Sequence, residues 1–456
     1  CFVVVSCSKW HYGHGGHHDD DDGGGGDNTI YRETEVVEGG PLNQGPRLIP
    51  SPDKLVVKVP PGLDEARLLF WLDELKIKVE DTIGCSCGDT NIKQWTVDTN
   101  LLDIETASRR LKDESSGEND LEGDRGFDIQ LDTITDFTPE IGQFITGELT
   151  TDGLVATGSS APVNIAVLDT GIDYARDLTP SPSSPYLFPS SDYSDCYDTN
   201  DGWSFVSRSN DIIDFNGHGT YVTQIIRDVL DNSDVDIDYR ILPLKVFNYR
   251  GQGSYWNIVC AMGYLKDIND HSGNINFVNA SFGGADTQQV LSEKTVLRSL
   301  IEDIQAQTLV VASAGNKGVN TDVPALEGHF ISSYPSDNIL AVGGYDFPEG
   351  STNDDDIFVH TDSNFGIQSI DVALEFENYA VELDTYTENT KDRAGLAGTS
   401  YGAAAMTGLA AEIYFRTGRP NPQVLKDRIL NSAVNRTGLN GQIGGGRAII
   451  REYIPF

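Results

Sequence analysis

The chain has 456 residues, of which 38% are hydrophobic, so it is long enough for one large domain and a smaller one, each with its own core. It carries 70 Asp and Glu against 32 Lys and Arg, a formal net charge of −38. A field of this sign repels nucleic-acid phosphates and anionic lipid surfaces and attracts cationic segments, which argues against a nucleic-acid partner.

The first 28 residues contain a short apolar run and then a polar, glycine-rich stretch. The run CFVVVSC is too short to span a bilayer, but it is typical of the end of a signal-peptide hydrophobic region. Residues 4–7 resemble a bacterial lipobox, which implies a lipid on Cys7 and removal of residues 1–6; the alternative is a terminus without lipid. We expect residues 11–28 to be a flexible tether, because their glycines give the histidines no fixed metal-binding geometry.

Between residues 52 and 132 the periodicity of the apolar residues changes several times. The order β-α-β-β-α-β that it indicates is the ferredoxin-like plan of a small α+β domain. Residues 118–125 are too polar for a core segment, and residues 133–160 have the Gly, Ser and Thr content of a junction. The expected strands are residues 54–60, 76–83, 92–97 and 127–131, and the expected helices are residues 63–75 and 103–114.

Four cysteines follow the N-terminal segment, and they allow three disulfide pairings among which the sequence does not choose. Export would permit disulfides, and no histidine lies at zinc-ligand spacing from these cysteines. The four are Cys85, Cys87, Cys196 and Cys260.

Beyond residue 160, continuous apolar runs alternate with helical patterns. Such runs are typical of parallel strands buried on both faces, so the alternation predicts an α/β domain with a mainly parallel sheet. Functional groups in these sheets gather at the carboxyl ends of the strands. The expected strands are residues 163–168, 241–247, 276–280, 308–313 and 339–343, and the expected helices are residues 220–230, 255–269 and 288–306.

Three short motifs in this region carry residue types that acyl-transfer chemistry needs. Asp169 ends an apolar run in NIAVLDTGID, His218 lies between glycines in NGHGT, and Ser400 opens a small-residue helix in AGTSYGAAA. A nucleophilic Ser needs a base to take its proton and a carboxylate to orient that base. Taken alone, Asp169 could belong to an aspartic protease, His218 could be structural, and Ser400 could be a helix cap. No second DTG or DSG occurs, however, and the three motifs occur together.

The order Asp, His, Ser is the subtilisin-type order, and the region from about residue 160 to the end resembles a subtilisin-like serine protease, or subtilase. The resemblance implies the three-layer subtilisin-like fold and catalysis by Asp169, His218 and Ser400. It extends to Ala-Gly-Asn316 after a strand, and it implies that the Asn316 amide and the Ser400 backbone N–H form the oxyanion hole.

Two further segments match those that bind the substrate backbone in subtilases. Residues 251–254 include Gly251 and Gly253, and residues 279–284 have the sequence NASFGG. The resemblance implies that substrates pair with these segments as added strands. The walls of the P1 pocket would be Ser281, Phe282 and Gly283 on one side and Ser313, Ala314 and Gly315 on the other. These walls carry no charge, which favours a neutral or apolar P1 residue, whereas the acidic loop 192–201 would favour basic residues if it covered the cleft.

The chain departs from the family pattern at several points. Tyr401 follows the nucleophile where Met is usual, and residues 373–377 (ALEFE) replace an Ala-Pro-Gly turn, so the approach to Ser400 is expected to differ. No cofactor is expected. Calcium is a common stabiliser of the family, but no site for it is assigned: Asp234, Asp236 and Asp238 alternate with apolar residues and are expected on the wet face of a strand.

Small domains of the ferredoxin-like plan precede subtilase catalytic domains as inhibitory, folding-assisting propeptides. The predicted organisation is therefore a signal remnant and tether (1–28), a propeptide-like domain and junction (29–145), and a catalytic domain (146–456). The chain is interpreted as an exported, lipid-anchored or secreted bacterial serine endopeptidase, monomeric, acting on protein or peptide substrates and inhibited by its own N-terminal domain. Two alternatives remain: a peptide ligase or macrocyclase on the same scaffold, and an inactive binding protein.

Overall fold

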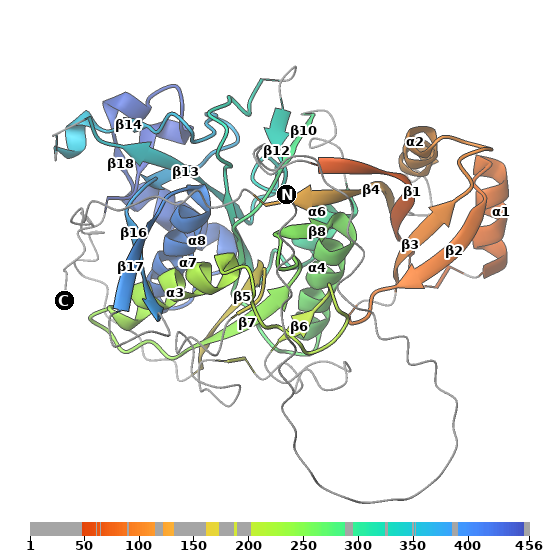
Figure 1. The fold of residues 1–456 in the computed structure, drawn as a ribbon, viewed down its shortest axis with the longest axis horizontal. Helices are drawn as coiled ribbons and strands as arrows, with labels where there is room; N and C mark the ends of the chain where they lie inside the picture. Colours follow the sequence, from red (N-terminus) through yellow and green to blue (C-terminus); the bar gives the residue numbers. More distant parts are fainter. Residues whose placement is uncertain are drawn as a thin grey trace, which may run out of the picture.

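The structure is a computed structural model that describes residues 48–60, 62–63, 65–88, 91–114, 122–131, 161–172, 187–188, 202–287, 295–323, 327–348, 351, 353–384 and 391–450. Within these ranges, none of the helices combines the length and the apolar character needed to cross a bilayer. The described residues form a small N-terminal domain and a large domain that lie side by side (Figure 1).

The N-terminal domain packs two helices on one face of an antiparallel sheet with the strand order β2-β3-β1-β4. The prediction of a ferredoxin-like α+β plan is therefore confirmed. Its elements are β1 (Leu48–Lys58), α1 (Glu65–Leu75), β2 (Val79–Gly84), β3 (Ile92–Val97), α2 (Ile104–Glu114) and β4 (Glu122–Gln130).

Both faces of this sheet are covered, which the alternation along β1 makes possible. Leu55 and Val57 point to one face, where they pack with Leu111 and other residues of the two helices. Val56 points to the opposite face and belongs to the core that includes the large domain's helices. The small domain thus buries its second face against its neighbour rather than leaving it in water.

The polar segment 118–125 was expected to lie outside a core, and for part of it this expectation is wrong. Strand β4 begins at Glu122, and the Asp124 side chain is only 5% exposed. Its carboxylate accepts hydrogen bonds from the Tyr255 hydroxyl (2.5 Å) and the Val296 N–H (2.6 Å) of the large domain. A buried carboxylate is tolerated because these donors replace water.

The large domain is built on a mainly parallel sheet, as predicted, and its strand order is β18-β19-β15-β13-β11-β9-β5-β7-β6. Its principal strands are β5 (Val163–Asp169), β6 (Trp203–Ser204), β7 (Tyr239–Lys245), β9 (Phe277–Ala280), β11 (Leu309–Ser313), β13 (Ile339–Asp346) and β15 (Val372–Glu375). The edge strands β18 (Val434–Asn435) and β19 (Arg447–Ala448) pair antiparallel, as does β14 (Phe358–Val359) with β13.

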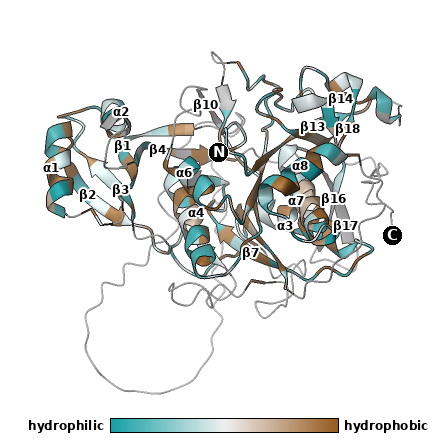
Figure 2. Ribbon diagram, turned by 180° about the vertical axis from the view of Figure 1, so that it is seen from behind, coloured by the Kyte–Doolittle hydropathy of each residue, from teal (hydrophilic) through white to brown (hydrophobic). Residues whose placement is uncertain are grey.

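Helices cover both faces of this sheet, which gives three layers. One core contains Ala166 and Leu168 of β5 with α4 (Tyr255–Asp270) and α6 (Val296–Asp303). The other contains Ile165 and Val167 with α3 (His218–Asp231), α7 (Thr399–Arg416) and α8 (Pro422–Ser432). Apolar residues, brown in Figure 2, run along the central strands. The prediction of a three-layer subtilisin-like α/β fold is confirmed.

Shorter elements lie outside the three layers. They are β8 (Gln252–Ser254), β10 (Ala285–Thr287), β12 (Glu327–His329), β16 (Tyr379–Asp384), β17 (Lys391–Leu396) and single turns of 3-10 helix at Asp354–Asp356, Thr437–Leu439 and Gly444–Gly446. Residues 234–238 were expected on a strand, and this expectation is wrong: β7 begins at Tyr239, and the preceding segment is irregular. Asp234 there contacts Arg416 of α7, so tertiary pairing rather than strand alternation positions it.

A disulfide joins the two domains. Cys85, just after β2, is bonded to Cys260 of α4, and the two Cα atoms are 5.4 Å apart across 175 residues of sequence. A salt bridge adds to the contact, since Lys58 Nζ of β1 lies 2.7 Å from Asp303 Oδ2 of α6. The small domain is therefore attached to the large one covalently as well as by packing.

Candidate functional site

The carboxyl end of β5 and the first residue of α3 bring Asp169 and His218 into hydrogen-bonding contact. Nδ1 of His218 lies 2.8 Å from Oδ1 and 3.0 Å from Oδ2 of Asp169. Both side chains are buried, and Asp169 Oδ1 also accepts the Thr170 N–H at 2.7 Å. A carboxylate in this position holds the imidazole proton on Nδ1, so Nε2 is the basic nitrogen.

This close approach depends on glycine. A Cβ atom on Gly219 would overlap the Gly171 carbonyl oxygen and lie 3.0 Å from Asp169 Cβ. Gly217, which caps α3, has a φ of 103°, in the left-handed region where a side chain is strained. The two glycines that flank His218 therefore let the start of α3 lie directly against the end of β5.

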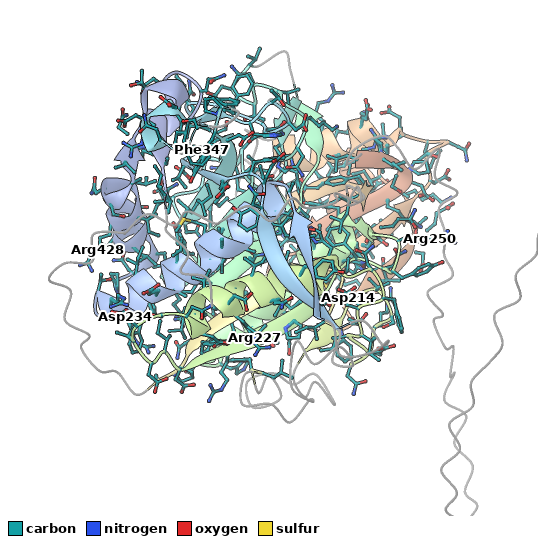
Figure 3. All side chains as sticks on the ribbon, turned by 60° about the vertical axis from the view of Figure 1, so that its left-hand side comes forward. Asp214, Arg227, Asp234, Arg250, Phe347 and Arg428 are labelled. Atoms are coloured by element: carbon teal, nitrogen blue, oxygen red, sulfur yellow. A yellow bond between two sulfur atoms is a disulfide. The ribbon has the colours of Figure 1, made fainter. Side chains whose placement is uncertain are left out.

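Asp214, labelled in Figure 3, organises the loop ahead of His218, although no sequence motif marks it. Its carboxylate accepts the N–H groups of Asn216 (2.8 Å), Gly217 (2.9 Å) and Thr220 (3.0 Å), and the Thr220 hydroxyl (2.8 Å). Burial alone would raise the pKa of Asp214, but the hydrogen bonds from Gly217 and Thr220 outweigh it and hold that pKa below its ordinary value. The ionised carboxylate thus fixes the entry to α3.

Ser400 is the second residue of α7 and is tied to the end of β9. Its hydroxyl donates to the Ser281 carbonyl oxygen at 2.8 Å, and the Ser281 hydroxyl donates to the Ser400 carbonyl oxygen at 2.7 Å. In this rotamer the Ser400 proton is directed to Ser281 rather than to the imidazole. The next residue, Tyr401, has its ring centroid 5.6 Å from that of His218, so the head of α7 lies beside the imidazole.

Asn316 follows β11 and is oriented by Thr399. Its Oδ1 accepts the Thr399 N–H at 2.9 Å and the Thr399 hydroxyl at 2.8 Å. Because an N–H can only donate, the atom that faces Thr399 must be the amide oxygen, and the Nδ2 group therefore points elsewhere. A Cβ atom on Gly398 would lie 3.2 Å from Nδ2, so the amide group lies against the turn that precedes Ser400.

Gly253 lies in the edge strand β8, and Gly251 immediately precedes that strand. Substrate was expected to pair with this segment. In this structure β4 of the N-terminal domain pairs antiparallel with β8, with Ile129 opposite Gly253, and the Leu131 N–H donates to the Gly251 carbonyl at 2.7 Å. A Cβ on Gly253 would lie 2.5 Å from the Val246 carbonyl oxygen, which explains the glycine. The edge of β8 is thus already paired with the chain's own strand β4.

The two expected pocket walls follow neighbouring parallel strands, β9 and β11. Phe282 does not face an open pocket: it is 2% exposed and packs on Phe247, with ring centroids 5.0 Å apart. Ser281 and Ser313 are also buried, as is Ala314. Gly283 and Gly315 both closely approach the same side chain, His329. His329 was not among the predicted site residues, because its local sequence carries no motif.

Other predicted residues fall elsewhere or outside the described ranges. Cys7, Cys196 and residues 192–201 lie outside them. Within the described part of the chain, no group of three or more His, Cys, Asp or Glu residues is arranged to hold a metal ion.

The arrangement can be set beside known proteins. The model of the subtilase family (Peptidase S8) matches residues 160–446, which is more than half of the chain. This chain belongs to the subtilase family.

Individual relatives are distant. The chain is 27% identical to subtilisin DY of Bacillus licheniformis over 242 residues, which cover 51% of this chain and 76% of that protein. It is 25% identical to the cell wall-associated protease of Bacillus subtilis (strain 168) over 224 residues, which cover 48% of this chain and 19% of that protein. A solved structure from the subtilase cytotoxin SubAB assembly matches with a TM-score of 0.48 and 18% identity, covering 68% of this chain and 93% of that chain.

The residue after Ser400, Tyr401, is buried next to a second tyrosine. Tyr401 is 2% exposed and lies 6.1 Å from Tyr379 between ring centroids. Burial, together with the nearby charge of Asp169, holds the pKa of Tyr401 well above its ordinary value, so the phenol stays neutral. A neutral aromatic side chain thus lies beside the imidazole of His218.

Residues 373–377, which were expected to replace an Ala-Pro-Gly turn, hydrogen-bond to the chain just ahead of Ser400. The Phe376 carbonyl accepts the Gly398 N–H at 2.7 Å, two residues before Ser400. Glu375 next to it is largely buried, and burial raises the pKa of its carboxyl to about 7, although the hydrogen bond from Asn378 opposes the shift. A titratable carboxyl of this subtilase therefore lies in the segment that hydrogen-bonds to the turn ahead of Ser400.

We predict that Glu375→Gln stabilises the protein above about pH 4.5 and not below it. The folded-state pKa of about 7 exceeds the ordinary value of 4.5, so this glutamate costs nothing below about pH 4.5; its cost grows between about pH 4.5 and 7 and is constant at higher pH. Urea unfolding should show no gain for the variant at pH 4.5 and a gain on the order of 1–3 kcal/mol at pH 8.5.

The matched control is Glu80→Gln, at an exposed carboxyl of β2, which should show no pH-dependent gain. An equal gain for Glu375→Gln at both pH values would show that lost charge is not the cause.

Proposed function

We propose that this subtilase is a serine endopeptidase that hydrolyses peptide bonds in proteins through Asp169, His218 and Ser400. The observation that carries the proposal is the buried hydrogen bond between Asp169 and the Nδ1 atom of His218, beside the head of the helix that bears Ser400. Membership of the subtilase family supports it.

In the proposed cycle, the Ser400 hydroxyl turns from the Ser281 carbonyl toward Nε2 of His218. The imidazole takes the proton as Oγ attacks the scissile carbonyl, and the Asp169 carboxylate stabilises the imidazolium. His218 then gives this proton to the leaving amine, which leaves an acyl group on Ser400. A water molecule, deprotonated by His218, attacks the acyl carbon, releases the acid and restores the Ser400 hydroxyl.

The negative charge of the tetrahedral intermediate needs donors placed in advance. We assign this role to Nδ2 of Asn316 and the backbone N–H of Ser400. Thr399 supports the assignment, because its two donors hold the amide oxygen of Asn316 and turn Nδ2 away. Ser400 is also in the first turn of α7, where the helix dipole favours a developing anion.

Replacing each group tests these roles separately. Ser400→Ala should abolish labelling by a fluorophosphonate and lower kcat by about 10⁶. Asn316→Asp keeps an oxygen for Thr399 but replaces the donor with an anionic oxygen, so labelling should persist while kcat falls by about 10²–10³ or more. Ser432→Ala, on α8, is the matched control and should retain both. Labelling of Ser400→Ala equal to wild type would refute the assignment.

Product masses separate the rival functions. Hydrolysis adds one water to each bond cut, whereas a ligase or macrocyclase would transfer the acyl group to an amine without that gain. Wild-type protein that neither labels nor cleaves would favour the inactive binding protein.

We also propose that residues 29–145 form an inhibitory, folding-assisting propeptide of a catalytic domain that spans residues 146–456. The pairing of β4 with β8 supports this, because a substrate would need the same edge hydrogen bonds. The buried Asp124 carboxylate accepts the N–H of Val296 at the start of α6, and Phe127 stacks on Tyr255 with ring centroids 4.6 Å apart. These contacts would hold the catalytic helices in place during folding.

The disulfide predicts how such a propeptide separates. Cutting the chain between residues 132 and 160 would leave the two fragments joined through Cys85 and Cys260. Wild-type protein allowed to process itself should run as one species on a non-reducing gel and as two on a reducing gel. Ser400→Ala should stay intact in both. Two separate wild-type fragments without reductant would contradict the tether.

We place the mature protein outside the cytoplasm of a bacterium, anchored by a lipid on Cys7. Stable disulfides are typical of oxidising compartments, and one curated relative is a cell wall-associated protease. Radiolabelled palmitate should enter wild-type protein expressed with its export signal and not Cys7→Ala. Equal labelling of both would remove the anchor from the account.

A further inference from the structure

The space between the two expected pocket walls holds the imidazole of His329. A Cβ atom built on Gly283 would overlap the ring, with Nδ1 and Nε2 both at 2.6 Å. A Cβ built on Gly315, on the other wall, would lie 2.6 Å from Cδ2 and from Nε2. The ring is therefore in contact with the main chain of both walls, in the volume that a substrate side chain would enter.

The backbone of His329 is fixed in this position. It lies in β12, which pairs with β10 so that His329 is opposite Ala285, two residues after Gly283. The His329 N–H donates to the Ser333 hydroxyl at 2.9 Å, and the next residue, Phe330, donates its N–H to the Gly284 carbonyl at 2.8 Å. The Phe330 ring packs edge-to-face on Phe127 at 5.5 Å between centroids. The side chain therefore enters the space from an anchored segment.

The ring itself is buried and uncharged. His329 is 4% exposed, and its Nδ1 lies 3.1 Å from the Ser332 hydroxyl. Burial, with a smaller contribution from Lys317, lowers the pKa of His329 to about 3. The imidazole is thus neutral across the pH range in which a protease with a histidine base works. It fills the space as an uncharged side chain.

We propose that His329 determines specificity by filling the P1 pocket, so that the enzyme cleaves after residues with small side chains, glycine, alanine and serine. This inference rests on the proposed function, because it assumes that the walls at Gly283 and Gly315 receive the P1 residue. A leucine or phenylalanine side chain would need the volume that the ring occupies. Cleavage after large residues would require the ring to leave both walls and its contact with Ser332.

The experiment uses full-length protein, processed and then reduced, with quenched peptides identical except for Ala, Leu or Phe at P1. Wild type should show a kcat/KM for Ala at least about 100-fold above that for Phe. His329→Ala should raise kcat/KM for Leu and Phe, so that the ratio falls below about tenfold. His271→Ala, at the exposed end of α4, is the matched control and should keep the wild-type ratio.

The outcomes separate the two claims. Wild-type hydrolysis that is as fast for Phe as for Ala overturns the role of His329 and leaves the protease assignment intact, whether or not His329→Ala folds. The same holds if a folded His329→Ala keeps the wild-type ratio. Absence of hydrolysis of every peptide, together with absence of fluorophosphonate labelling of Ser400, overturns the proposed function and this inference with it.

Discussion

The chemistry that we propose for this site depends on one buried ion-dipole contact, between the carboxylate of Asp169 and the Nδ1 atom of His218. An isolated carboxylate at 1% exposure is costly, and it is tolerated here because the Thr170 N–H and the imidazole replace its water. The contact exists only because Gly219 has no side chain to separate β5 from α3. The end of β5, the start of α3 and the loop before His218 hold these two groups together.

Ser281, Asn316 and Ser400 are also brought to this site by the fold. The parallel strands β5, β9 and β11 end at one edge of the sheet, and they carry Asp169, Ser281 and Asn316 there or just beyond. Helix α7 brings Ser400 to that edge from another layer. Gly408 allows this, because a Cβ there would lie 2.7 Å from Val229 Cβ of α3. The small residues of α7 beyond Ser400 thus allow the helix to pack closely against α3, and they are not needed for the reaction itself.

The N-terminal domain covers the edge strand that we propose as a substrate-binding segment. Strand β4 uses the hydrogen bonds of β8 that an extended peptide would use, and the contact is strengthened by Asp124 and by the Lys58–Asp303 salt bridge. A disulfide then adds a covalent link that outlasts cleavage of the backbone. Under the proposed function, activity depends on both the chain break and the state of this bond.

Local patterns were sufficient to predict much of this molecule. Strand β3 and the mainly parallel sheet follow from apolar periodicity, and the motifs around Asp169, His218 and Ser400 carry their own signal. What could not be predicted depends on distant partners. The burial of Asp124 needs Tyr255 and Val296, 131 and 172 residues away. His329 acquires its place only when β12 pairs with β10.

The most direct test of the account is a crystal structure of the protein treated with a peptide phosphonate. The account predicts a bond from Ser400 Oγ to phosphorus, a phosphonyl oxygen within hydrogen-bonding distance of Asn316 Nδ2, and His218 Nε2 next to Oγ. A phosphonate on another residue, or an imidazole that remains out of reach of Oγ in the adduct, would contradict it.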